Sequence, residues 1–172
     1  MKDDAGGGAI RVRLTTSELM VAAYVGSARN VQSLMQGWTP AAGVGLCNTW
    51  TPNIEGAAGE MAVAKGLGMY WRPIIGDNHS DDVGPYQVRT NVSRKHDDLC
   101  LRPRDRIDRV FIGVLSFLPE FEIVGWITGG DGKQDCWLRD GSADRPQCYY
   151  VPRAALAPMS SLPRPLLAEL RQ

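Results

Sequence analysis

The chain has 172 residues, of which 44% are hydrophobic and 22% are charged. This length is typical of one domain with a core of its own, and the composition excludes wholesale disorder. The 19 basic and 19 acidic residues cancel, so overall charge neither indicates nor excludes a nucleic-acid partner, and only local clusters are informative.

The four cysteines lack CxxC spacing, and the two histidines do not complete a zinc-ligand pattern, so we expect free thiols in a reducing, cytoplasmic setting. The acidic, glycine-rich start does not resemble a signal peptide, and the apolar runs are shorter than the ~18 residues of a membrane span, so no membrane partner is expected. We predict a flexible tail at 1–13, one α/β domain at 14–157 and a proline-rich tail at 158–172.

The first predicted helix runs from Thr15 to Gln36. Thr15 and Glu18 have the spacing of a capping box, and Gly26 is expected to loosen the helix. Apolar residues recur at helical spacing and predict a stripe that faces the core. The stripe comprises Leu19, Met20, Ala23, Tyr24, Ala28, Val31, Leu34 and Met35.

The second predicted helix, about Asn53 to Gly68, has almost no side-chain bulk. Glycines and alanines recur along it, and glycine costs helix stability unless something compensates. The sequence therefore predicts that another backbone packs tightly against this helix.

Strand patterns occupy the second half of the chain. The run Arg109–Phe117 is nearly all apolar and predicts a central strand buried on both faces, followed by a hairpin across Leu118–Glu120. We predict an α/β fold with a mixed sheet of four to five strands flanked by the two helices. The other predicted strands are Tyr86–Val92, Asp98–Arg102, Phe121–Ile127 and Cys148–Val151.

Acidic and polar residues form a candidate metal site. Glu60 lies on the small-residue helix and Asp82 lies at a turn before the strand that carries Gln87, Val88 and Arg89. Gln87 and Arg89 alternate with Val88 and therefore share one face of the strand. Phosphodiester hydrolysis with Mg²⁺ needs clustered oxygen ligands and a cation near the phosphate, which these residue types supply.

The order and spacing of these segments resemble the PD-(D/E)XK nuclease superfamily, and more closely its small phage- and prophage-type members. The matching pieces, within 54–151, are the Gly/Ala-rich helix with Glu60, then Asp82-Val83-Gly84, Gln87-Val88-Arg89-Thr90, Arg102-Pro103 and Val124-Gly125-Trp126-Ile127. The resemblance implies a restriction-endonuclease-like core and DNA hydrolysis with Mg²⁺ or Mn²⁺. It also implies catalytic roles for Glu60, Asp82, Gln87 and Arg89, with metal ligands Glu60, Asp82, Gln87 and the Val88 carbonyl.

Two positions depart from the superfamily pattern. Gln87 replaces a glutamate, which lowers the negative charge of the site, and Arg89 replaces a lysine, which arginine cannot match as a base. Lys65 and Lys95 are alternative sources of an ammonium group. The alternative function is an inactive nuclease-fold protein that binds DNA, or a phage-encoded inhibitor or adaptor that binds a host DNA-processing or defence protein. A virion or assembly component is a third hypothesis.

The segment 89–109 contains seven basic and four acidic residues. Arg94, Lys95, Arg102 and Arg104 are predicted DNA contacts, since a local excess of cations can follow a phosphate backbone. The alternative is a solvated loop whose arginines and aspartates pair with each other.

Each site residue also has a purely structural interpretation. Glu60 would pair with Lys65. Asp81 and Asp82 would be turn residues, and Arg89 would pair with a neighbouring carboxylate. His79 and His96 are expected to be solvated loop residues, with a place at a metal beside Asp82 as the alternative for His79.

Overall fold

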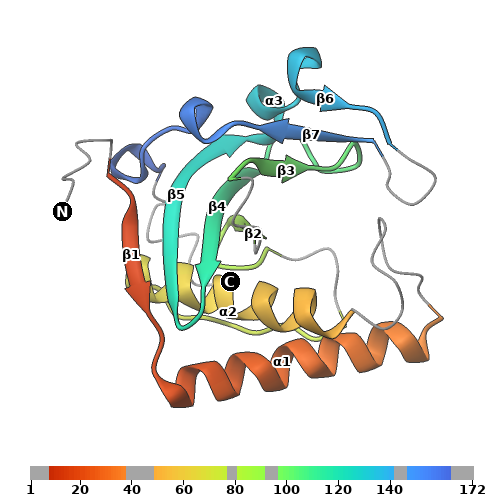
Figure 1. Cartoon of the computed structure of the whole chain (residues 1–172), viewed down its shortest axis with the longest axis vertical. Coiled ribbons are helices and arrows are strands. Elements are labelled where there is room, and N and C mark those ends of the chain that lie inside the picture. Colours follow the sequence, from red (N-terminus) through yellow and green to blue (C-terminus); the bar gives the residue numbers. More distant parts are fainter. Residues whose placement is uncertain (1–7, 38–48, 77–80, 92–96, 142–146, 164–172) are drawn as a thin grey trace.

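The chain folds into successive layers of helix, helix, sheet and sheet (Figure 1). A computed structural model describes residues 8–37, 49–76, 81–91, 97–141 and 147–163, and the structural statements below refer to these ranges. Helix α1 (Thr16–Met35) is the outermost layer, and helix α2 (Trp50–Leu67) lies between α1 and the main sheet.

The main sheet is mixed and has four strands in the order β1-β5-β4-β2. Strands β1, β5 and β4 are antiparallel neighbours, whereas β2 runs parallel to β4 at the edge of the sheet. The α/β prediction with a mixed sheet is therefore confirmed. The strand bounds are Ile10–Arg13 for β1, Tyr86–Asn91 for β2, Val110–Phe117 for β4 and Glu120–Thr128 for β5.

A separate three-stranded sheet covers the other face of β4 and β5. Its order is β3 (Leu99–Leu101), β7 (Cys148–Val151) and β6 (Leu138–Arg139). It packs through a second apolar cluster that contains Leu101, Phe111 and Ile127. The sequence patterns predicted β3 and β7 but not their separation into a second sheet. The described residues also form four short helical pieces: α3 (Gly129–Gly132) and the 3₁₀ turns Asp135–Trp137, Arg153–Ala155 and Met159–Ser161.

Strand β4 is the central strand that its composition predicted. Six consecutive residues, 111–116, are buried, because α2 covers one face and the second sheet covers the other. Ile112 belongs to the cluster under α2 and Phe111 to the cluster under the second sheet. The predicted hairpin to β5 is also present, with Phe117 opposite Glu120.

Both predicted tails include residues that belong to the folded domain. Ile10–Arg13 forms strand β1 along β5, where Val12 is buried, because this edge offers backbone hydrogen bonds and an apolar face. At the other end Met159 joins the main core, and the Tyr86 hydroxyl donates to the Pro163 carbonyl. The tail boundaries at residues 13 and 158 are therefore wrong.

Helix α1 has the predicted capping box, with both Thr15 and Glu18 hydrogen bonds formed. The predicted core-facing stripe is wrong. Ala22, Val25, Gly26 and Asn30 are the buried residues of α1, whereas the large side chains Met20, Tyr24, Val31, Leu34 and Met35 are exposed. Close contact with the small-residue helix α2 selects the smallest side chains of α1, so the large ones point away.

The α1–α2 crossing is centred on Gly26, which does not interrupt the helix. A Cβ atom at Gly26 would lie 2.4 Å from the Ile54 Cα and 2.6 Å from the Asn53 carbonyl oxygen. The small-residue helix also approaches β2, since a Cβ at Gly59 would lie 2.0 Å from the Thr90 Oγ1. Tight packing against this helix is thus confirmed on two sides.

We expect Gly26→Ala to lower the free energy of unfolding by roughly 1–3 kcal/mol, although alanine favours helix by about 1 kcal/mol. The new methyl group would clash with backbone atoms, which cannot move without separating the helices. Gly56→Ala is the matched control, because a Cβ there meets nothing within 4 Å and should stabilise the helix. Urea denaturation of both variants measures the difference. Equal stabilisation by the two alanines would contradict the close crossing.

Three of the four cysteines lie in the described ranges, and Cys100, Cys136 and Cys148 are all free thiols. Burial, together with the neighbouring Cys148, raises the pKa of the Cys100 thiol to about 12, so it stays protonated at neutral pH. Within the described part of the chain, no helix is both long and apolar enough to cross a membrane.

Candidate functional site

Glu60 is the buried carboxylate of α2, and its side chain is only 8% exposed. Arg29 of α1 binds it through two parallel hydrogen bonds, Nη1 to Oε1 at 2.6 Å and Nη2 to Oε2 at 2.9 Å. The Trp71 indole donates a third hydrogen bond, 3.2 Å to Oε2. Glu60 thus has a bidentate cation partner, and the pairing with Lys65 is wrong, because Lys65 reaches Glu18 instead.

Arg29 is held in place for this contact. Its Nε donates 2.8 Å to the Ile74 carbonyl, so the guanidinium plane is oriented from two sides. Burial alone would lower the pKa of Arg29, but the hydrogen bonds and charge of Glu60 outweigh it and raise the pKa. Arg29 is therefore permanently charged and neutralises Glu60.

Asp82 lies at the free edge of β2 and accepts a hydrogen bond of 2.7 Å from the Val88 backbone N–H to its Oδ2. Burial and the nearby negative charge of Glu60 raise the pKa of Asp82 to about 6, against the opposing effects of the Val88 hydrogen bond, Arg89 and Arg29. The fold thus places Asp82 near enough to Glu60 for the charge of Glu60 to disfavour ionisation of Asp82.

The Val88 carbonyl points to the same free edge. The N–H and C=O of one strand residue lie on one side, and the Val88 N–H bonds Asp82 rather than β4. The Val88 oxygen also accepts a long hydrogen bond, 3.3 Å, from Arg89 Nη1. Asp82 and the Val88 carbonyl are therefore neighbouring oxygen donors.

Gln87 and Arg89 project from the opposite face of β2. Val88 packs in the core beneath α2, whereas the Arg89 guanidinium lies 5.0 Å from the Phe111 ring centre on the face covered by the second sheet. Arg89 pairs with Asp105 at 3.0 Å, as its structural interpretation predicted, and the Gln87 amide donates 3.0 Å to Asp81. These two side chains do not join Glu60.

The loop after β3 carries the predicted DNA contacts that the structure describes. Arg102 and Arg104 are exposed and have no ion pair among the described residues, whereas Arg106 pairs with Asp108 and Arg109 with Asp81. Burial of part of Arg102, with the positive charges of Arg89 and Arg104, lowers the pKa of Arg102. Arg94, Lys95, His79 and His96 lie outside the described residues.

Glu60, Asp82 and the Val88 carbonyl form a cluster of oxygen donors beside the cation of Arg29. Among the described residues, no group of three His, Cys, Asp or Glu side chains could hold a metal ion. The candidate site instead combines two carboxylates, Glu60 and Asp82, with the Val88 carbonyl. This donor set suits one hard divalent cation. Gln87 does not belong to it, because its amide binds Asp81.

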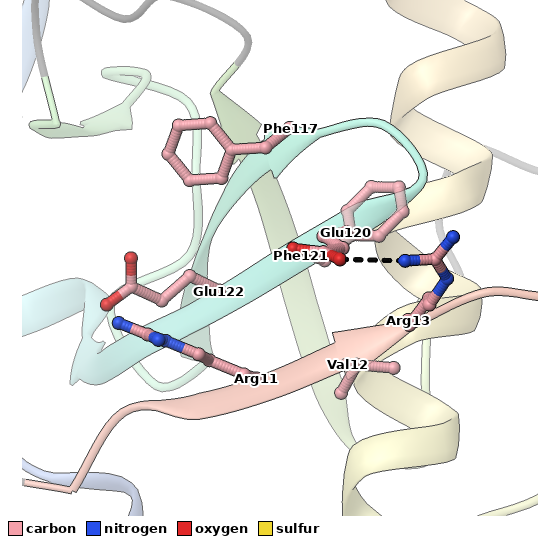
Figure 2. Close-up of a pocket in the computed structure, with 7 residues that line it drawn as sticks. All are labelled: Arg11, Val12, Arg13, Phe117, Glu120, Phe121 and Glu122. Atoms are coloured by element: carbon pink, nitrogen blue, oxygen red, sulfur yellow. Dashed lines mark hydrogen bonds and ion pairs between the residues drawn. The ribbon is translucent and has the colours of Figure 1, made fainter.

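A shallow pocket of about 410 Å³ lies at the opposite edge of the main sheet, between β1 and the end of the β4–β5 hairpin (Figure 2). Figure 2 shows Arg13 paired with Glu120 at its rim, and Glu122 pairs with Arg153. Because β1 and β2 are the two edges of the sheet, this pocket is separate from Glu60 and Asp82.

Comparison of the chain with protein-family models, with curated proteins and with solved structures gave no match.

Sequence reasoning missed the residues that hold the cluster. Arg29 and Trp71 lie 31 and 11 residues from Glu60 in the sequence, and neither belongs to a recognisable motif. One signal was available for Arg29, since it is the sole cation of α1 and lies beside small residues on the face that packs on α2.

Proposed function

We propose that this protein is a metal-dependent nuclease of the PD-(D/E)XK type with a restriction-endonuclease-like core. The observation that carries the proposal is a buried carboxylate, Glu60, near a half-buried one, Asp82, because burial and the charge of Glu60 together raise the pKa of Asp82. Two adjacent carboxylates are costly unless a cation shares them, and Arg29 neutralises only one of the two charges.

Asp82, the Val88 carbonyl and Glu60 would hold one Mg²⁺ or Mn²⁺ ion, which would polarise a phosphodiester and lower the pKa of bound water. Arg29 keeps the Glu60 carboxylate oriented, and the Val88 N–H does the same for Asp82. Arg89 is the residue at the lysine position of the superfamily, but Asp105 and Phe111 hold it on the other face of β2. Because arginine is not deprotonated at neutral pH, Arg89 cannot act as a base, and in this proposal it supplies only positive charge for the DNA backbone.

Two arginines of the β3–β4 loop, Arg102 and Arg104, have no ion pair among the described residues, and they support DNA as the substrate class. Both are exposed at the surface, and a phosphate would offset the partial burial and the neighbouring positive charges that lower the pKa of Arg102. Removing one such contact should lower the salt slope of DNA binding by about one unit.

We expect the purified protein to nick or degrade plasmid DNA with Mn²⁺, and Asp82→Asn to reduce the rate on the order of a hundredfold or more. Asparagine still accepts the Val88 N–H bond but loses the charge that the metal needs. Asp108→Asn is the matched control, because Asp108 is an exposed partner of Arg106 in a different loop. Full activity of Asp82→Asn, with the control also active, would contradict the assignment.

A second function is supported by a specific observation: the site residues are already engaged inside the protein. Glu60 binds Arg29 and Trp71, Gln87 binds Asp81, and Arg89 binds Asp105. Such a network suits a nuclease-fold protein without activity that binds DNA, or a phage inhibitor or adaptor that binds a host protein. Calorimetry with Mn²⁺ separates the two functions, since heat of binding that disappears in Asp82→Asn supports the nuclease.

A further inference from the structure

Helix α1 presents a long apolar face that nothing in the described structure covers. Six large side chains are between 45% and 84% exposed on it: Met20, Val21, Tyr24, Val31, Leu34 and Met35. Figure 1 shows α1 as the outermost layer, with α2 and both sheets on its other side. Contiguous apolar surface of this kind marks an interaction site in soluble proteins.

The exposed positions follow a heptad pattern. Met20, Val21 and Tyr24 are followed one or two heptads later by Val31, Leu34 and Met35, with Ser27 and Ala28 at the corresponding central positions. Such spacing directs one seam of a helix towards a partner helix. The opposite seam, with Ala22 and Gly26, is already occupied by α2.

The order of these residues is symmetric about the midpoint between Ser27 and Ala28. Tyr24 and Val31 are equidistant from that midpoint, and so are Val21 with Leu34 and Met20 with Met35. In an antiparallel pair of identical helices centred there, each large apolar residue meets another, and the small central residues allow the helices to approach closely. A two-fold interface requires this type of self-complementarity.

Charge also favours a second copy of this chain. Helix α1 contains only two charged residues, Glu18 and Arg29, and both are bound by residues of the same chain, Lys65 and Glu60. The exposed face therefore brings no like charges together when two copies meet. It offers no charge for recognition of a phosphate backbone or of an acidic or basic peptide.

The available area is that of a modest interface. A helix of 20 residues is about 30 Å long, and exposed side chains of this size contribute on the order of 100 Å² each. The face therefore supplies several hundred Å² per copy, near the lower end of specific interfaces, so a dissociation constant in the micromolar range is expected.

We propose that the protein forms a two-fold symmetric dimer through antiparallel packing of the two α1 helices, with Tyr24 of each copy opposite Val31 of the other. The dimer is independent of the proposed nuclease function, because the α1 face lies on the side of the helix away from Glu60.

Sedimentation equilibrium of the full chain from about 1 to about 500 µM tests the proposal. The unchanged protein should pass from monomer to dimer within this range. Tyr24→Glu and Val31→Lys should each weaken dimerisation roughly tenfold or more, because each places two charges in the apolar seam. Ile107→Glu is the control, since Ile107 is 67% exposed in the β3–β4 loop and should leave the dimer unchanged.

The double variant Tyr24→Glu with Val31→Lys decides the orientation. In the antiparallel dimer each glutamate meets a lysine of the other copy, so the double variant should dimerise more strongly than either single variant. In a parallel pair, like charges would meet and the double variant should be the weakest. A monomer throughout the concentration range, a dimer unaffected by either single change, or a double variant weaker than both single variants would overturn the proposal. Circular dichroism melting of each variant verifies that it is folded.

Discussion

Arg29→Met should lower the free energy of unfolding by about 3–5 kcal/mol, the cost of leaving a buried carboxylate without its cation. Arg29 supplies two hydrogen bonds to Glu60 and is its only ion-pair partner among the described residues. Methionine preserves most of the length and apolar contact of the side chain, so the expected loss comes from the uncompensated charge. Urea denaturation monitored by tryptophan fluorescence measures it.

The double variant Arg29→Met with Glu60→Gln tests this cause. Glutamine carries no charge and still accepts the Trp71 hydrogen bond, so the double variant should regain most of the lost stability. Arg13→Met is a matched control, because Arg13 and Glu120 form a pair that is 71% and 62% exposed and contributes below about 1 kcal/mol. A double variant as unstable as the single one would show that packing, not charge, is the role of Arg29.

Asp82→Asn should stabilise the metal-free protein at pH 7, by about 2 kcal/mol. Burial and then Glu60 raise the pKa of Asp82 from its ordinary value of 3.8 to about 6. As the pH falls below 3.8, the carboxyl becomes protonated in both the folded and unfolded states and its effect on stability disappears. As the pH rises to 6 the unfolded chain ionises first, so the folded state loses stability across this window. Full conversion of the shift gives about 3 kcal/mol, which partial solvent exposure reduces.

Unfolding in urea at several pH values between about 3.5 and 7.5 measures the effect in buffer free of divalent cations. The wild type and Asp82→Asn should agree at the acid end and separate as the pH rises. Asp108→Asn should not reproduce this separation, because the Arg106 hydrogen bond lowers the pKa of Asp108. Equal pH profiles for the wild type and Asp82→Asn would contradict the raised pKa.

Metal addition connects this measurement with the proposed function. Mn²⁺ that binds the ionised Asp82 should stabilise the wild type and leave Asp82→Asn unchanged, so the difference at pH 7 should shrink. A difference that persists at saturating Mn²⁺ would favour the non-catalytic alternative, in which the cluster serves only the structure.

The local patterns of the sequence determined the elements of the fold. The capping box of Thr15 and Glu18 placed the start of α1, and the apolar run 110–117 placed the central strand. These features depend on hydrogen bonds and side-chain periodicity within a few residues, which a single sequence displays directly. The small residues of α2 likewise predicted a close approach, which occurs at Gly26 and at Thr90.

The sequence by itself also singled out Glu60 and Asp82 as carboxylates that belong together. Only the tertiary structure decided what surrounds them: the bidentate contact from Arg29, the turning away of Gln87 and Arg89, and the outward direction of the large α1 side chains. The physical reason is the same in each case. Periodicity defines the faces of a helix or strand, but which face becomes buried depends on what packs against it. Because α2 has almost no side-chain bulk, it packs against the small-residue face of α1, and the large apolar side chains of α1 stay exposed.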